Sequence, residues 1–73
     1  MSRQSTFEVT VGQALRYLVG DVLRHNKLVI IGSGYTEGST CWTFTVMSSE
    51  LTAKQVQRLV WDAGVGSCEV KPV

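Results

Sequence analysis

The chain has 73 residues, which leaves room for one domain, because chains of about this size bury only roughly 60% of their unfolded surface. Its 44% apolar content and single proline are typical of a globular domain and exclude a disordered or collagen-like chain. Seven basic residues against six acidic ones give a net charge of +1 without a basic run, which disfavours nucleic acid as a partner. No apolar run approaches the roughly 18 residues of a membrane span, and no signal-peptide segment opens the chain. We therefore expect a complete cytoplasmic protein without membrane association.

The N-terminal third predicts a strand followed by a helix. Residues 1–5 are polar and are expected to be flexible, ahead of a single globular domain at 6–73. Residues 6–10 alternate polar and apolar, as a half-buried strand does. The phrase Thr10-Val11-Gly12-Gln13 is typical of a capping box, in which the threonine hydroxyl and the glutamine side chain bind free backbone N–H groups at a helix start. We expect a helix to begin at Thr10.

Apolar residues at three- and four-residue steps then predict the buried stripe of this first helix. They are Val11, Ala14, Leu15, Leu18, Val19, Val22 and Leu23. The helix is expected to end near Asn26, a residue that tolerates the left-handed conformation common just past a helix.

Two further strands are expected around a loop. Residues 28–31 form a short apolar run, and Gly32-Ser33-Gly34 is expected to end it as a turn. After a loop to Ser39, residues 40–46 alternate again. Their inward face would carry Trp42, Phe44 and Val46.

The second helix repeats the capping phrase at Thr52-Ala53-Lys54-Gln55 and runs to about Ala63. Gly64 is well placed as the left-handed residue that closes it. Its core stripe would be Val56, Leu59, Val60 and Ala63. A last strand is expected at 68–71.

This order predicts an α+β domain, a β-α-β-β-α-β ferredoxin-like two-layer sandwich with a four-stranded antiparallel sheet and two helices on one face. In that topology the first and third strands lie in the middle of the sheet, so Phe7 and Val9 would join the inward residues of 40–46 in the core. The alternative is α-β-β-α-β, with residues 1–9 as a flexible tail.

No residue cluster has the spacing of a catalytic, cofactor or metal site. Gly32-x-Gly34-x-x-x-Gly38 joins two strands, whereas a phosphate-binding loop precedes a helix, so we expect an ordinary hairpin loop. Cys41, Cys68 and His25 lack metal-ligand spacing, and the two cysteines are expected to be free thiols on opposite faces of the sheet.

We therefore expect no cofactor, no metal and no enzyme activity. The six carboxylates are scattered singly, and His25 is expected to act only as a charge at a helix end. Acylphosphatases share this general fold and use an arginine in a glycine-containing loop after the first strand. Residues 9–12 run into the predicted helix without an arginine, so that resemblance stops at the functional residue.

RNA-recognition domains have the same strand order and display aromatic rings on the first and third strands, where bases stack on them. Phe7, Trp42 and Phe44 occupy those strands. If these rings faced solvent, strict alternation would bury Glu8 and several threonines under the helices, which is costly. We therefore expect the rings in the core and a threonine-rich outer face.

One aromatic residue on each predicted helix points away from the apolar stripe. Tyr17 and Trp61 fall among polar residues on a helical wheel, so both rings are expected on the outer face of the helical layer. With four basic neighbours they would form one aromatic and basic protein-binding patch. The six residues of this patch are Tyr17, Trp61, Arg16, Arg24, Lys54 and Arg58.

The function that we expect is a non-catalytic protein-binding module, a small inhibitor or regulator of the kind encoded by phages and mobile elements, which occupies a surface of a larger partner. One alternative is a small nucleic-acid-binding domain. Another is a structural homodimer, in which the apolar edge strand Leu28 to Ile31 pairs with its own copy.

Overall fold

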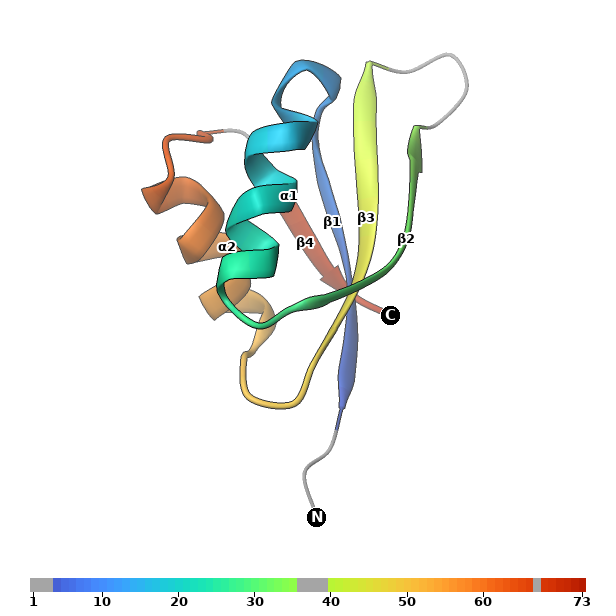
Figure 1. The fold of residues 1–73 in the computed structure, drawn as a ribbon, viewed down its shortest axis with the longest axis vertical. Coiled ribbons are helices and arrows are strands. Elements are labelled where there is room, and N and C mark those ends of the chain that lie inside the picture. Colours follow the sequence, from blue (N-terminus) through green and yellow to red (C-terminus); the bar gives the residue numbers. More distant parts are fainter. Residues whose placement is uncertain (1–3, 36–39, 67) are drawn as a thin grey trace.

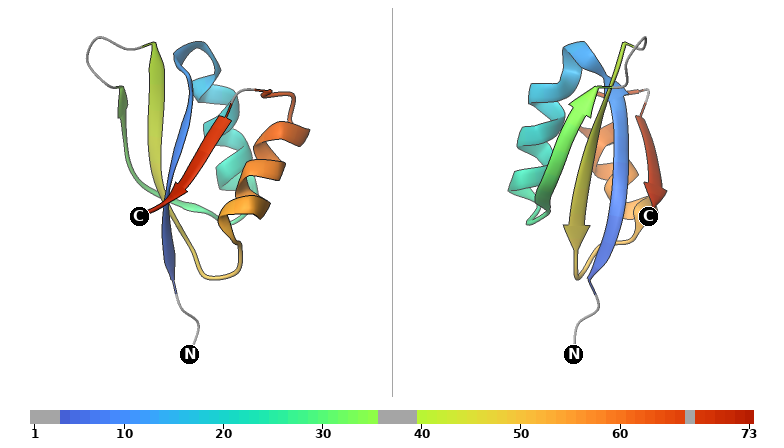
Figure 2. Two further views of the ribbon diagram at one scale, coloured as in Figure 1. Left: turned by 180° about the vertical axis from the view of Figure 1, so that it is seen from behind. Right: turned by 90° about the vertical axis from the view of Figure 1, so that its right-hand side faces the viewer.

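Four strands form one antiparallel sheet in the order β2-β3-β1-β4, and two helices cover one of its faces (Figures 1 and 2). The computed structural model describes residues 4–35, 40–66 and 68–73. The α+β class, the antiparallel sheet and the two helices expected from the sequence are confirmed. The elements are β1 (Ser5–Gly12), the 3-10 turn η1 (Gln13–Leu15), α1 (Arg16–His25), β2 (Val29–Tyr35), β3 (Cys41–Ser48), α2 (Ala53–Asp62) and β4 (Cys68–Pro72).

The N-terminal segment is a central strand, so the alternative with a flexible tail before the first helix is wrong. β1 pairs with β3 along its whole length, from Ser5 opposite Ser48 to Gly12 opposite Cys41, and with β4 on its other side. Ser5, expected in the flexible N-terminus, is already part of β1. Residues 1–3 of that predicted segment lie outside the described residues.

One core lies between the sheet and the helices. It consists of Phe7, Val9, Val11, Val19, Leu23, Leu28, Phe44, Val46, Val56, Val60 and Val65. Phe7 and Phe44 are 4% and 7% exposed, so these rings lie under the helices as predicted. Trp42, also expected in the core, is half-buried and packs against its margin. The outer face is rich in threonine, as expected, and the hydroxyls of Thr10 and Thr43 lie 3.2 Å apart on it.

The two Thr-x-x-Gln phrases have different structures. At α2 the capping box is confirmed: the Thr52 N–H donates to Gln55 Oε1 at 2.8 Å, and the Gln55 N–H donates to Thr52 Oγ1 at 3.3 Å. The capping box predicted at Thr10 is wrong. There β1 continues to Gly12, and α1 begins only at Arg16, without a side-chain cap. Strand pairing prevails because Val11 fills the core between its neighbours on β3 and β4.

The buried face of α1 also differs from the predicted stripe. Val19, Gly20 and Leu23 are buried, whereas Leu15 and Leu18 are 37% and 43% exposed. The late helix start accounts for part of this difference, because Val11 belongs to β1, and Ala14 and Leu15 belong to η1. Gly20 faces the sheet: a Cβ atom added there would lie 3.6 Å from Phe44 Cζ.

The predicted end is confirmed for α2 and wrong for α1. Gly64 closes α2 with a φ of 99°, as predicted. After α1 the left-handed residue is Lys27, with a φ of 63°, and not Asn26 as expected. The Asn26 side chain instead donates to the Val22 carbonyl at 2.7 Å, which holds this residue against the last helical turn.

β2 is longer than the sequence predicted. It continues through Gly32-Ser33-Gly34 to Tyr35, so the predicted turn at these residues is wrong. Pairing with β3 stabilises this segment as a strand, with an irregularity between Ile30 and Gly32. Leu28 precedes β2 and is only 4% exposed, so it belongs to the core and not to the edge strand expected at 28–31. Gly38 of the predicted hairpin loop lies outside the described residues.

Candidate functional site

The six residues of the predicted patch fall into two separate clusters. Tyr17 and Trp61 are 74% and 51% exposed, as predicted. Arg16, Tyr17 and Arg24 line a groove between α1 and the strands β2 and β3, which we call the α1 groove. The other three, Lys54, Arg58 and Trp61, line a depression on α2, which we call the α2 depression. Among the described residues none lines both. The outward direction of the two rings is confirmed, and a protein-binding role of the six residues stays a prediction.

The α1 groove is assembled from three elements. It has a volume of about 240 Å³, and α1 contributes its arginines, Tyr17, Gly20 and Asp21. Ser33 comes from β2, and Trp42 and Phe44 come from β3. Because Gly20 has no side chain, the Phe44 ring lies close to the α1 backbone. The groove therefore joins a basic helix face to an aromatic part of the sheet.

The Arg16 side chain is held in place by several contacts. Its guanidinium carbon lies 4.6 Å from the centre of the Tyr17 ring and 5.5 Å from that of Trp42, which are cation–π distances. Nη1 donates to the Gln13 carbonyl at 2.8 Å, and Nη2 contacts the Tyr17 hydroxyl at 3.4 Å. A guanidinium has about five N–H donors, so the donors that these two contacts do not use stay available for an external acceptor. Arg16 is thus an immobilised cation with free donor capacity.

Trp42 connects this arginine to the end of β2. Its ring stacks on Tyr35, with centroids 6.3 Å apart and planes at 26°, and meets the edge of Phe44 at the same centroid distance. Its Nε1–H is buried and has no acceptor among residues 4–35, 40–66 and 68–73. Buried donors are normally bonded, and leaving one unpaired costs about 1–3 kcal/mol. Within the part of the chain that the structure describes, the aromatic side of the groove therefore retains a polar group without a partner.

The α2 depression is simpler, because a single helix supplies all of its lining. Its lining residues are Lys54, Gln57, Arg58, Trp61 and Asp62. Gln57 donates to the Cys68 carbonyl at 3.3 Å, which ties α2 to β4. Among the described residues, no cation–π contact or ion pair orders Lys54, Arg58 or Trp61. These three side chains are exposed to solvent.

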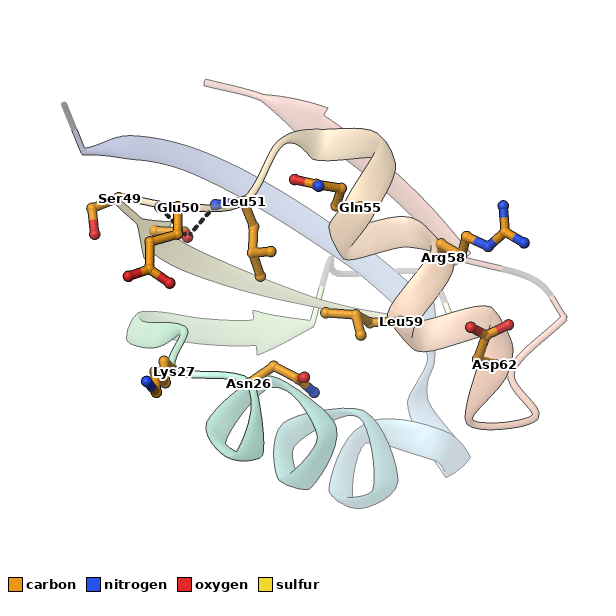
Figure 3. A pocket seen from close by; sticks show the side chains of 10 residues that line it. Asn26, Lys27, Ser49, Glu50, Leu51, Gln55, Arg58, Leu59 and Asp62 are labelled. Atoms are coloured by element: carbon orange, nitrogen blue, oxygen red, sulfur yellow. Dashed lines mark hydrogen bonds between the residues drawn. The ribbon is translucent and has the colours of Figure 1, made fainter. Parts of the chain in front are cut away.

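A third groove, of about 460 Å³, lies between the C-terminal end of α1, the turn after β3, and α2. Figure 3 shows Leu51 and Leu59 reaching into it. The Ser48 hydroxyl accepts from the N–H groups of Glu50 and Leu51, at 3.2 and 3.0 Å, and so fixes the turn. Its rim mixes both signs of charge: Lys27, Glu50, Arg58 and Asp62. The groove therefore favours no particular charge in a ligand.

The titratable residues of the described chain do not converge on one point. In that part of the chain, no three His, Cys, Asp or Glu side chains lie close enough to hold a metal ion. His25 lies at the end of α1, with Nδ1 2.8 Å from the Asp21 carbonyl. Cys41 pairs with Gly12 and Cys68 with Val11, so the thiols lie on opposite faces as predicted, and no disulfide joins them. Burial raises the pKa of the Cys68 thiol to about 11, which keeps it protonated and weakly nucleophilic at neutral pH.

Neither helix of the described chain is long and apolar enough to cross a membrane. No protein-family model matches the sequence, and no curated protein or solved structure is significantly similar to it.

Sequence reasoning missed what the sheet contributes to the α1 groove and to the Tyr35 ring stacked beside it. Ser33 and Tyr35 were assigned to a turn and a loop, and Trp42 to the core. The available signal was the alternation itself, because in an extended strand Ser33 and Tyr35 share one face. The structure pairs them with Phe44 and Trp42 on the helical side.

Proposed function

We propose that this chain is a non-catalytic protein-binding module that occupies a surface of a larger protein through the α1 groove. The observation that carries the proposal is the guanidinium of Arg16 held over both Tyr17 and Trp42. Tryptophan, tyrosine and arginine dominate the binding energy of protein interfaces. Arg16 has already lost much of its rotamer freedom, so binding through it costs less conformational entropy.

The exposure of one ring in the groove and of another beside it supports the same function. Tyr17 is 74% exposed and Tyr35 is 62% exposed. The Arg16 guanidinium connects the Tyr17 ring to the half-buried Trp42, and the Tyr35 ring stacks on Trp42 directly. A partner side chain that covers these rings would remove apolar surface from water beside a fixed positive charge. Such a module acts by occupation alone, as an inhibitor or regulator does.

We also infer that the domain is a ferredoxin-like sandwich. The order β2-β3-β1-β4, with both helices on one face, supports this assignment. The scaffold serves many unrelated activities, so the proposed function rests on the groove and not on the fold.

A second candidate is a structural homodimer formed through β2. Val29 and Ile31 are 58% and 54% exposed on this edge strand, and exposed apolar edges favour pairing with a further strand. The molar mass in solution, measured by light scattering over a range of concentrations, tests this candidate. A monomer at every concentration would contradict it.

Affinity capture from nuclease-treated lysate of the source organism, followed by reconstitution with the identified purified partner, tests the proposed function. We expect a one-to-one complex that Tyr17→Ala weakens about tenfold or more and that Trp61→Ala leaves nearly unchanged. The two variants are matched, since each removes one exposed ring from a basic cluster on a helix. A complex that depends on Trp61 and not on Tyr17 would contradict the assignment to the α1 groove. Capture only from a parallel lysate that was not treated with nuclease would favour a nucleic-acid-binding domain instead.

A further inference from the structure

The two edges of the sheet differ in how well they are protected against an additional strand. β4 carries Glu69 and Lys71, whose side chains pair at 3.2 Å, and it ends in Pro72. Charges and proline on an edge hinder further strand pairing. β2, on the opposite edge, contains no charged residue and no proline (Figure 1). β2 is therefore the edge that is open to another strand.

The regular part of β2 lies beside the α1 groove. The irregularity of pairing lies between Ile30 and Gly32, and from Gly32 to Tyr35 each residue has a partner on β3. Ser33 lines the groove from the middle of this regular segment. A strand added here would run about 4.8 Å from β2, and every second side chain of it would face the helical side of the sheet. Those side chains would enter the α1 groove.

The charge of the groove defines which side chains fit there. Among residues 4–35, 40–66 and 68–73, Arg16 and Arg24 line it against a single acidic residue, Asp21. Arginine binds carboxylates through two parallel hydrogen bonds, and its binding geometry is better defined than that of lysine. The contacts of Arg16 with Tyr17 and Trp42 already orient one of the two guanidinium groups.

We propose that the occupant of this site is an extended acidic segment of the partner protein, which adds to β2 as a fifth strand and directs alternate Asp or Glu side chains toward Arg16 and Arg24. Main-chain hydrogen bonds to the β2 edge supply affinity, and the carboxylate contacts supply specificity, as in other strand-addition complexes. This inference rests on the proposed function and names the chemistry of its partner.

Selection of short random peptides displayed on phage against the immobilised protein tests the inference. We expect enriched sequences in which acidic residues alternate with apolar or β-branched ones. A fluorescein-labelled peptide of the most enriched sequence, followed by fluorescence anisotropy, should bind the double variant Arg16→Ala/Arg24→Ala about tenfold or more weakly than wild type. Lys54→Ala/Arg58→Ala removes the same charge from the α2 depression and should bind like wild type. N-methylation of alternate peptide amides should weaken binding similarly, because it removes main-chain donors to β2.

Folding of each variant is verified by circular dichroism. Because Arg16 also packs on Trp42, Arg24→Ala alone serves as a second variant: Arg24 is exposed, and its loss should still weaken peptide binding several-fold.

Several results would overturn the acidic strand. Enriched peptides without alternating acids, or with full affinity for the Arg16→Ala/Arg24→Ala variant, would overturn it while leaving a protein-binding module. No enrichment, together with a captured partner that depends on Tyr17, would do the same. Failure of both selection and capture would remove the proposed function as well. If a labelled oligothymidylate bound more tightly than the peptide, and its affinity fell steeply with salt concentration, the ligand of the arginines would be phosphate groups and not carboxylates. A dimer in solution through β2 would assign the edge to a second copy.

Discussion

A Thr-x-x-Gln phrase stands near the start of both helices, but the two helices meet the sheet differently. Each has ten residues and carries an exposed aromatic ring among basic residues. In α2 the phrase caps the helix, and Val56 and Val60 of the predicted stripe are buried. At α1 the phrase does not cap the helix, because β1 continues to Gly12. Gly20 of α1 faces the sheet, and Arg16 packs on Trp42. The helix that departs from the pattern expected from its sequence, α1, is therefore the one whose groove combines residues of the helix and of the sheet.

The largest expected effect is the difference in stability between alanine variants of the two tryptophans, Trp42 beside α1 and Trp61 on α2. Trp42→Ala should lower the free energy of unfolding by about 2–3 kcal/mol, somewhat less than a fully buried ring, because Trp42 is half-buried against the core. Trp61→Ala should cost less than about 1 kcal/mol, because Trp61 is 51% exposed. Urea denaturation measures both. Equal losses would show that Trp61 is as firmly packed as Trp42 and would remove the contrast between the clusters.

Asparagine substitutions of Thr10 and Thr52, the first residues of the two Thr-x-x-Gln phrases, form a matched pair that should change stability by a smaller amount. Asparagine is at least as good an N-cap as threonine, so Thr52→Asn should change stability by less than about 0.5 kcal/mol. Thr10 lies in a central strand, where asparagine is unfavourable, and Thr10→Asn should cost about 1 kcal/mol. Thermal denaturation of the two variants under identical conditions provides the comparison. A neutral Thr10→Asn would indicate that Thr10 caps α1 after all.

The third expected effect is a gain in stability within α1. Gly20→Ala should raise the free energy of unfolding by about 0.5–1 kcal/mol, because alanine favours the helix and its Cβ would meet Phe44 Cζ at an ordinary contact distance of 3.6 Å. Gly64→Ala, at the end of α2, is the control of opposite sign: its φ of 99° should make alanine cost about 1 kcal/mol. Urea denaturation measures both changes. A destabilising Gly20→Ala would mean that Phe44 cannot accommodate a methyl group beneath α1.

Much of the fold could be predicted because its signals are local. Alternation in residues 6–10 and 40–46 identified two strands, and the buried Phe7, Val9, Phe44 and Val46 confirm their inward face. The N-cap at Thr52 and the glycine at 64 also depend on neighbouring backbone groups alone, and both hold in the structure.

The candidate site was predictable only in part. A helical wheel correctly placed Tyr17 and Trp61 in solvent, because exposure depends on the direction of one side chain. The convergence of Arg16 with Trp42 depends on β3 lying beside α1, and the wheel contains no information about that neighbour. Sequence reasoning therefore named three residues of the α1 groove and missed the contributions of the sheet.

By itself the sequence determined the order of strands and helices, the inward face of the central strands and the cap of α2, since each follows from side-chain period or from hydrogen bonds within a few residues. Only the tertiary structure decided where β1 ends, because Thr10 and Val11 gain more from partners on β3 and β4 than from capping a helix. It also decided that β2 continues to Tyr35, because pairing with β3 holds a glycine-containing segment extended. These two non-local pairings bring Ser33 and Trp42 to α1, where they line the groove that we propose as the binding site, and they place Tyr35 against Trp42.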